Sequence, residues 1–129
     1  MKRAASTPLG RVLGSGAAHS GTQHWWQQRV TAIALTVLTL WFVISLLCLP
    51  DLSWSSVHTW LAKPFSALSM SMLVLAACWH SQLGVSVVIE DYVHGAVSKT
   101  LALLLSTFAH LAVAGVALLA VLRIAASGN

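Results

Sequence analysis

A histidine within an apolar stretch is the residue of this chain whose chemistry is easiest to specify. His80 follows Cys78 and Trp79, roughly ten residues before the only adjacent pair of acids. A histidine inside a membrane segment is costly and therefore needs a partner. Neutral imidazole is a common ligand of haem iron. His80 is therefore either an axial haem ligand or a histidine hydrogen-bonded to a neighbouring helix.

The residues that end this stretch suggest a second kind of chemistry, at the membrane edge. Asp91 and Tyr92 stand where the apolar segment should leave the lipid. A tyrosine hydroxyl can donate a hydrogen bond to a quinone carbonyl, and a nearby carboxylate can orient the quinone or relay protons. The alternative is an ordinary interfacial aromatic and a helix-end acid, although an acid near a helix C-terminus opposes the helix dipole.

Aromatic and basic residues come just before the first apolar run. Trp25 and Trp26 are typical of the headgroup level, with Arg29 at the mouth of the helix. Simple interfacial anchoring explains this pattern. Alternatively, His24 and Arg29 bind an anionic group held just inside the membrane, such as the propionates of a haem.

His110 lies in the last apolar run, at a depth similar to that of His80 if the two helices are antiparallel. The two histidines could then clamp one haem within this chain. We favour the simpler interpretation, in which His110 is a hydrogen-bonded residue between helices. Because the sequence has no C-x-x-C-H, any haem would be held non-covalently. Cys48 and Cys78 have no zinc-type spacing and are predicted to be reduced packing residues.

The elements that must position these residues are membrane helices. Of the 129 residues, 57% are hydrophobic and only 8% are charged, and the mean hydropathy is +0.81. A soluble domain carries about a quarter charged residues, so this chain lacks the charge to solvate a surface. Its long apolar runs predict an all-α membrane protein with three transmembrane helices. The net charge of +4 does not indicate nucleic-acid binding, because most basic residues precede the first apolar run.

The chain divides into seven predicted segments. They are an N-terminal segment 1–28, transmembrane helices at 29–50, 64–90 and 99–125, a connector 51–63, a turn 91–98 and a tail 126–129. The apolar run starts too late and is too long for a secretory signal, and the N-terminal segment is glycine-rich rather than clearly amphipathic, which disfavours a transit peptide. Apolar positions in the connector suit a short helix on the membrane surface. Thr31, Thr36 and Thr39 can bond to their own helix or to a neighbour.

Three spans place the two chain ends on opposite sides of the membrane. The N-terminal side collects most of the basic residues: Lys2, Arg3, Arg11, Arg29 and Lys99. The other side collects Lys63 and Arg123. The positive-inside rule therefore predicts a cytoplasmic (or matrix) N-terminus and a periplasmic C-terminus. Asp91 and Tyr92 would then face the cytoplasmic interface, and the connector would be external.

Two stretches of the sequence resemble the hydrophobic membrane anchor, or D-type subunit, of succinate dehydrogenase (succinate:quinone oxidoreductase, respiratory complex II). The first is Gly-Thr-Gln-His-Trp-Trp-Gln-Gln-Arg-Val-Thr-Ala-Ile-Ala at 21–34, and the second runs from His80 to His94. The second is more specific because it fixes a histidine and an Asp-Tyr pair at a set separation. Three spans of this length and order also fit the family.

The resemblance implies a role for each motif residue. His80 would be one axial ligand of the iron in a b-type haem, and the other ligand would come from a partner anchor, the C-type cytochrome b subunit. Arg29 and His24 would lie near the haem propionates. Tyr92 would hydrogen-bond ubiquinone, with Asp91 beside it.

The resemblance also implies partners and a location. A flavoprotein subunit and an iron–sulfur subunit would dock on the cytoplasmic face and pass electrons from succinate to ubiquinone, within the tricarboxylic acid cycle and the respiratory chain. The chain itself would be a non-catalytic anchor with no succinate site. It would be a multi-pass protein of the bacterial inner membrane, or of the mitochondrial inner membrane in a eukaryote.

Other functions remain open at this point. A quinol:fumarate reductase, which runs the reverse reaction, could use a similar anchor. A free-standing dihaem cytochrome b would need at least four membrane histidines, whereas the predicted spans offer only His80 and His110. The chain could also be a cofactor-free assembly or structural protein of the membrane. In that case replacing His80 with alanine would leave both the visible spectrum and quinone reduction unchanged.

Overall fold

The computed structural model describes residues 19–127, which form four helices. These are α2 (His19–Leu47), α3 (Trp54–Ala62), α4 (Pro64–Tyr92) and α5 (Ala96–Ser127). Most of the predicted N-terminal segment 1–28 and the end of the predicted tail 126–129 lie outside the described residues. Within the described range, α2, α4 and α5 are long and apolar enough to cross a membrane. The predicted all-α fold with three spans is confirmed, while the orientation of the chain ends stays a prediction.

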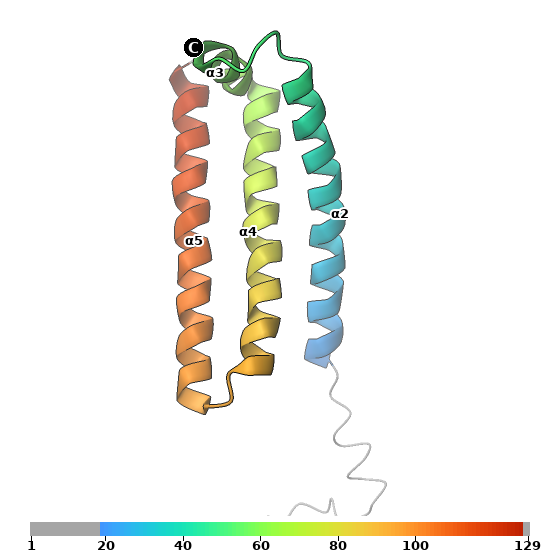
Figure 1. Ribbon diagram of the computed structural model, residues 1–129, viewed down its shortest axis with the longest axis vertical. Helices are drawn as coiled ribbons and strands as arrows, with labels where there is room; N and C mark the ends of the chain where they lie inside the picture. The colour runs from blue at the N-terminus through green and yellow to red at the C-terminus, as the bar shows by residue number, and fades with distance from the viewer. Residues whose placement is uncertain (1–18, 128–129) are drawn as a thin grey trace, which may run out of the picture.

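The three long helices lie side by side as a single layer, with α4 between α2 and α5 (Figure 1). α4 packs against both neighbours, and the short helix α3 crosses one end of the layer, where it packs on α4 and α5. A residue of α4 can therefore contact either outer helix. A site built from residues of several helices must be centred on α4.

The helix ends follow local sequence signals. α4 begins at Pro64, where the fixed backbone of proline suits a first helical position. It ends before Val93, and Gly95 belongs to the short turn that leads into α5. α2 begins at His19, before the predicted start of the apolar run near Val30. The polar residues ahead of that run include no proline and several good helix formers, so the membrane helix continues past its apolar part.

The connector contains the predicted short helix, α3. Ser53 caps its N-terminus and accepts a hydrogen bond from the backbone N–H of Ser56. Asp51 precedes the cap, and hydrogen bonds from Ser53 and Ser56 lower the pKa of its carboxyl from 3.8 to about 2. The carboxylate is therefore ionised at neutral pH and holds the start of α3 in place.

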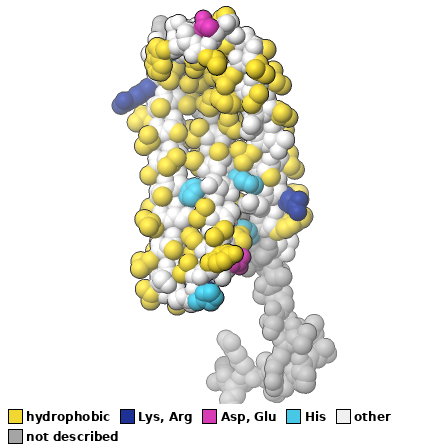
Figure 2. All heavy atoms as spheres, viewed as in Figure 1, with side chains coloured by type: hydrophobic (Ala, Val, Ile, Leu, Met, Phe, Trp, Pro, Cys, Tyr) yellow, Lys and Arg dark blue, Asp and Glu magenta, His cyan; other side chains and the backbone are white. Residues whose placement is uncertain are grey.

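Little of the layer is buried, as expected for a chain whose solvent is lipid. The small α4 residues Ser66, Ala67 and Ser69 are buried at helix contacts, because small side chains let membrane helices approach closely. Large apolar side chains are exposed along all three long helices. Figure 2 shows hydrophobic side chains over the height of the visible face, with few charges among them. The exposed apolar surface of the layer is thus suited to lipid or to other apolar helices.

An aromatic cluster fastens α3 to the long helices. Trp60 of α3 stacks on Trp41 of α2 with ring centroids 5.8 Å apart, and Phe42 lies 6.2 Å from the same ring. Phe65 of α4 meets Trp41 edge-on at 6.0 Å. Such aromatic pairs add stabilisation beyond the area that they bury. The cluster joins three elements at the end of the layer where α3 lies.

We expect Trp60→Ala to destabilise the folded chain by about 3–5 kcal/mol, because a buried aromatic side chain leaves a cavity when truncated. Trp60 is 8% exposed, whereas Trp54, on the same helix, is 77% exposed. Trp54→Ala is therefore the matched control and should change stability by less than about 0.5 kcal/mol. Thermal unfolding in detergent measures both variants. Equal effects of the two substitutions would contradict a clamping role for the cluster.

Candidate functional site

Polar side chains from all three long helices meet within the membrane-spanning part of the layer. His80 lies twelve residues before Tyr92, or about 18 Å along α4. Figure 2 shows histidine side chains near mid-height of the layer and at its lower end. We call the mid-height residues that bond between helices the polar belt; they are Gln28 and Thr31 of α2, His80, Ser81 and Gln82 of α4, and Thr107 and His110 of α5.

His80 joins α4 to α2. Its Nδ1 lies 2.9 Å from the hydroxyl oxygen of Thr31, and its Nε2 lies 3.5 Å from the side-chain nitrogen of Gln28. Thr31 is buried, and its hydroxyl also lies 2.8 Å from the backbone oxygen of Gln27. The carbonyl oxygen of the Gln28 side chain is buried and has no hydrogen-bond partner. The expectation that His80 needs a partner is confirmed, and the partner is Thr31.

His110 joins α5 to the other side of α4. Its Nδ1 lies 2.7 Å from the backbone oxygen of Ser106, and its Nε2 lies 3.2 Å from the hydroxyl of Ser81. Both ring nitrogens therefore have partners, and the interpretation of His110 as a hydrogen-bonded interhelical residue is confirmed. Because His80 is directed to α2, the two imidazoles do not face each other. The arrangement gives no support to a single-chain haem clamp.

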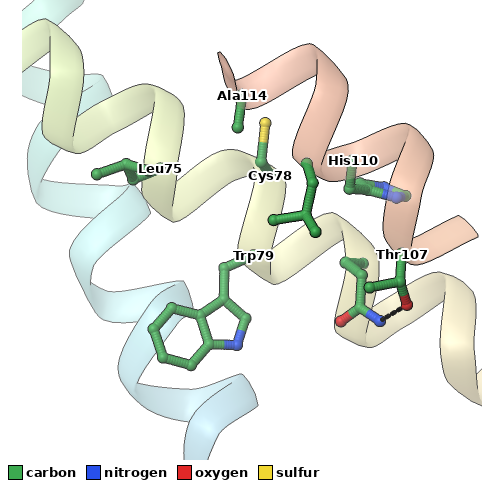
Figure 3. A pocket seen from close by; sticks show the side chains of 8 residues that line it. Leu75, Cys78, Trp79, Thr107, His110 and Ala114 are labelled. Carbon is green, nitrogen blue, oxygen red and sulfur yellow. Dashed lines mark hydrogen bonds between the residues drawn. The ribbon is translucent and has the colours of Figure 1, made fainter. Parts of the chain in front are cut away.

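A groove lies between α4 and α5 next to this second contact. It encloses about 400 Å³ and is mostly apolar. Figure 3 shows Leu75, Cys78 and Trp79 from α4 on one side of it, and Thr107, His110 and Ala114 from α5 on the other. The side-chain nitrogen of Gln82 lies 3.3 Å from the Thr107 hydroxyl at the edge of the groove. Cys48 and Cys78 are both free thiols, and Cys78 helps to line the groove.

The two residues proposed for an anionic group lie on different faces of α2. The guanidinium carbon of Arg29 lies 5.2 Å from the ring centre of Trp25, and Arg29 is exposed. This is a cation–π contact near the start of the helix. His24 is half-buried and stands one turn before Gln28, on the same helix face. Gln28 and Thr31, rather than Arg29, are the α2 residues that reach His80.

Asp91 and Tyr92 lie in the last turn of α4, where both side chains are exposed. Tyr92 is 79% exposed, so its hydroxyl is open to a ligand or to another chain. Lys99 donates a hydrogen bond from Nζ to the backbone oxygen of Glu90 at 2.8 Å. A cation at the C-terminal end of a helix interacts favourably with the helix dipole. This contact offsets the unfavourable position of the two acids.

The contact between Gln28 and His80 was not predicted from the sequence. Thr31 was expected to bond either its own helix or a neighbour, and it does both. The available signal was spacing, because Gln28 and Thr31 stand three apart on α2 and so share a face. The sequence could not show that this face is the one turned toward His80.

Comparisons with known proteins agree with this architecture. A family described as the succinate dehydrogenase/fumarate reductase transmembrane subunit matches residues 3–123. The chain is 38% identical over 93 residues to the succinate dehydrogenase hydrophobic membrane anchor subunit of Paracoccus denitrificans, covering 72% of each chain. It is 36% identical over 84 residues to the subunit of that name from Rickettsia conorii, covering 64% of this chain and 67% of the relative.

A further relative extends the match beyond these bacteria. The succinate dehydrogenase membrane anchor subunit of Reclinomonas americana is 32% identical over 89 residues, covering 67% of this chain and 74% of that protein. The resemblance first seen in two short motifs is therefore confirmed over most of the chain.

A double-mutant cycle tests whether the polar belt holds α4 to α5. We expect Gln82→Leu and Thr107→Val to show a coupling of about 0.6 kcal/mol, the typical strength of an interhelical hydrogen bond in a membrane protein. Thr100 provides a matched control, because its hydroxyl bonds the backbone of its own helix at Ala96. Thr100→Val paired with Gln82→Leu should show no coupling. The cycle is measured by unfolding in detergent, and equal coupling in both pairs would refute the interhelical bond.

Proposed function

Because the chain belongs to the succinate dehydrogenase/fumarate reductase transmembrane subunit family, we propose that, as the membrane anchor of a succinate dehydrogenase, it holds a b-type haem and helps to form a ubiquinone site. Three apolar spans and relatives from Paracoccus and Rickettsia fit a multi-pass inner-membrane protein. The observation that carries the haem proposal is the imidazole of His80. It lies inside a membrane span with one ring nitrogen firmly bonded and the other almost free.

The residues around His80 fit a haem. Nδ1 is held by Thr31, and Nε2 makes only the 3.5 Å contact with Gln28, so one nitrogen is available to iron. The buried Gln28 carbonyl lacks a partner, which indicates a polar site that is incomplete in the isolated chain.

This chain would supply one of two axial ligands. In residues 19–127, no group of three His, Cys, Asp or Glu side chains gathers in a way that could hold a metal ion. With His80 as one ligand, the resemblance to the family implies that the second would come from the C-type cytochrome b anchor. A bound haem supplies a one-electron redox centre within the bilayer.

Arg29 and His24 of α2 would lie near the haem propionates. Arg29 is exposed one position after Gln28, so its guanidinium is accessible to an anionic group on a neighbouring molecule. A guanidinium matches a carboxylate with two parallel hydrogen bonds. His24, half-buried one turn before Gln28, is the second candidate on this helix.

Tyr92 and Asp91 would form this chain's part of the quinone site. The Tyr92 hydroxyl is free to donate a hydrogen bond to a ubiquinone carbonyl, and the Asp91 carboxylate next to it can hold or pass a proton. Both residues end the same helix that carries His80. The exposed apolar faces of the layer suit a partner anchor. A flavoprotein and an iron–sulfur subunit would dock at the Tyr92 end and deliver electrons from succinate.

The physiological direction is a separate question, because the family description covers succinate dehydrogenases and fumarate reductases alike. The named relatives are all succinate dehydrogenase subunits. We therefore propose succinate oxidation as the working direction, with quinol:fumarate reduction as the alternative.

Tyr92→Phe tests the quinone site by removing one hydroxyl and leaving the ring. We expect ubiquinone reduction by the complex to fall about 2- to 10-fold, the range for one lost hydrogen bond of about 0.5–1.5 kcal/mol. Succinate oxidation with an artificial acceptor should be unchanged, because that route does not use the quinone site. Equal loss of both activities would argue for an assembly defect and against a quinone role for Tyr92.

His80→Ala tests the haem site. We expect the low-spin haem spectrum of the purified complex to disappear or to become that of a haem with one protein ligand. His110→Ala is the matched control and should keep the spectrum, because both of its ring nitrogens already bond Ser106 and Ser81. An unaltered spectrum in His80→Ala would remove His80 from the ligand set, and loss of the spectrum in His110→Ala would revive the single-chain clamp.

A further inference from the structure

We propose that Thr31 is a positioning residue for His80, which holds the imidazole proton on Nδ1 so that Nε2 is the nitrogen presented to iron. This inference rests on the proposed role of His80 as a haem ligand. The juxtaposition that carries it is the buried Thr31 hydroxyl, which lies 2.9 Å from His80 Nδ1 and 2.8 Å from the Gln27 backbone oxygen.

The single proton of the Thr31 hydroxyl decides the tautomer. The hydroxyl oxygen can donate one hydrogen bond and accept others. It is placed to donate to the Gln27 carbonyl, which lacks a proton and can only accept. Toward His80 the hydroxyl must then accept, so Nδ1 carries the proton and donates it. Nε2 is left with its lone pair, the state in which an imidazole binds a metal.

The opposite tautomer makes fewer hydrogen bonds. With the proton on Nε2, the Thr31 hydroxyl would have to turn from the Gln27 carbonyl to Nδ1. The Gln28 amide would also have to reverse, so that its oxygen rather than its nitrogen faced Nε2 across 3.5 Å. Two hydrogen bonds would then replace three, and the one between His80 and Gln28 would span 3.5 Å. Inside a bilayer no water restores the lost bond, so the arrangement with Nδ1–H is favoured.

Gln28 has a different part in this arrangement. Its amide nitrogen is a donor 3.5 Å from Nε2, as expected opposite a lone pair. The contact is long, and the carbonyl of the same amide is buried without a partner. An amide held this weakly would leave Nε2 accessible to a haem iron. Thr31 therefore fixes the orientation of the imidazole ring, whereas Gln28 only contacts Nε2, the nitrogen that would bind iron.

A donor hydrogen bond from Nδ1–H makes an imidazole a more basic ligand, and partners of this kind typically change metal affinity 10- to 100-fold. In the purified complex we expect Thr31→Val, which keeps the side-chain shape, to lower haem affinity by that factor. The midpoint potential of the haem should rise, because a less basic ligand stabilises ferric iron less. Thr31→Ser restores the hydroxyl and should return both values toward those of the unaltered chain.

Two matched controls separate the bond to His80 from other effects. Thr36 lies on the same helix, and its hydroxyl bonds the Ala32 backbone oxygen at 2.9 Å while its side chain is exposed. Thr36→Val should leave affinity and potential unchanged. Gln28→Leu removes the 3.5 Å contact at Nε2 and should change affinity and potential less than Thr31→Val does, because Gln28 does not hold the ring at Nδ1. Loss of haem in Gln28→Leu with normal binding in Thr31→Val would overturn the proposal.

A measurement without haem gives an independent readout. The ¹⁵N shifts of labelled His80 in haem-free protein should show a protonated Nδ1 and an unprotonated Nε2, and Thr31→Val should mix the two tautomers. If Thr31→Val does not assemble, Thr31→Ala takes its place, with succinate oxidation by an artificial acceptor reporting assembly. Unchanged shifts, affinity and potential in the variant lacking the hydroxyl would refute the role of Thr31.

The His80→Ala variant distinguishes failure of this proposal from failure of the proposed function. If His80→Ala retains the low-spin spectrum, the haem assignment itself fails. If His80→Ala loses that spectrum while the Thr31 variants match the unaltered chain, only the positioning role fails. Failure of Thr31→Ser to restore the values would likewise refute the hydroxyl as the cause.

Discussion

The lack of water inside a bilayer governs how these helices fit together. A polar side chain there must find its partner on its own helix or on a neighbouring one. Thr31 meets His80 between α2 and α4, and Gln82 meets Thr107 between α4 and α5. Most of the surrounding contacts are apolar and would tolerate sliding of one helix along another. The polar belt is directional, so it fixes the depth at which the three helices align and, with it, the depth of His80.

Much of the fold follows from the sequence because span length and composition are local properties. Three spans, the short connector helix and the need of His80 for a partner could all be predicted. Helix rotation could not, because apolar residues cover all sides of a membrane helix and leave no amphipathic stripe to set its facing. For the same reason the sequence did not show that Trp60 would be buried and Trp54 exposed.

The sequence predicted individual residues of the candidate site but not how they are arranged relative to one another. The motifs identified His80 and Tyr92, and the structure places them in the middle and at the end of one helix. For Gln28 the only signal was its three-residue spacing from Thr31, since a glutamine near a membrane surface is ordinary. Arg29, beside it in the sequence, turns away from His80 toward Trp25 because neighbouring residues of a helix point about 100° apart. Because the three long helices form a single layer, this chain can line the candidate site from one side only.

The aromatic cluster around Trp60 makes the two ends of the layer mechanically unequal. At the end where α3 lies, rings from α2, α3 and α4 interlock, and Val121 of α5 is buried as well. At the opposite end α4 and α5 share a short turn, while no chain connection within the described residues ties α2 to either of them. Local stability follows buried contact. Thermal splaying of the helices is therefore greatest at the end that carries Tyr92, the end at which the proposed ubiquinone would enter and leave between side chains.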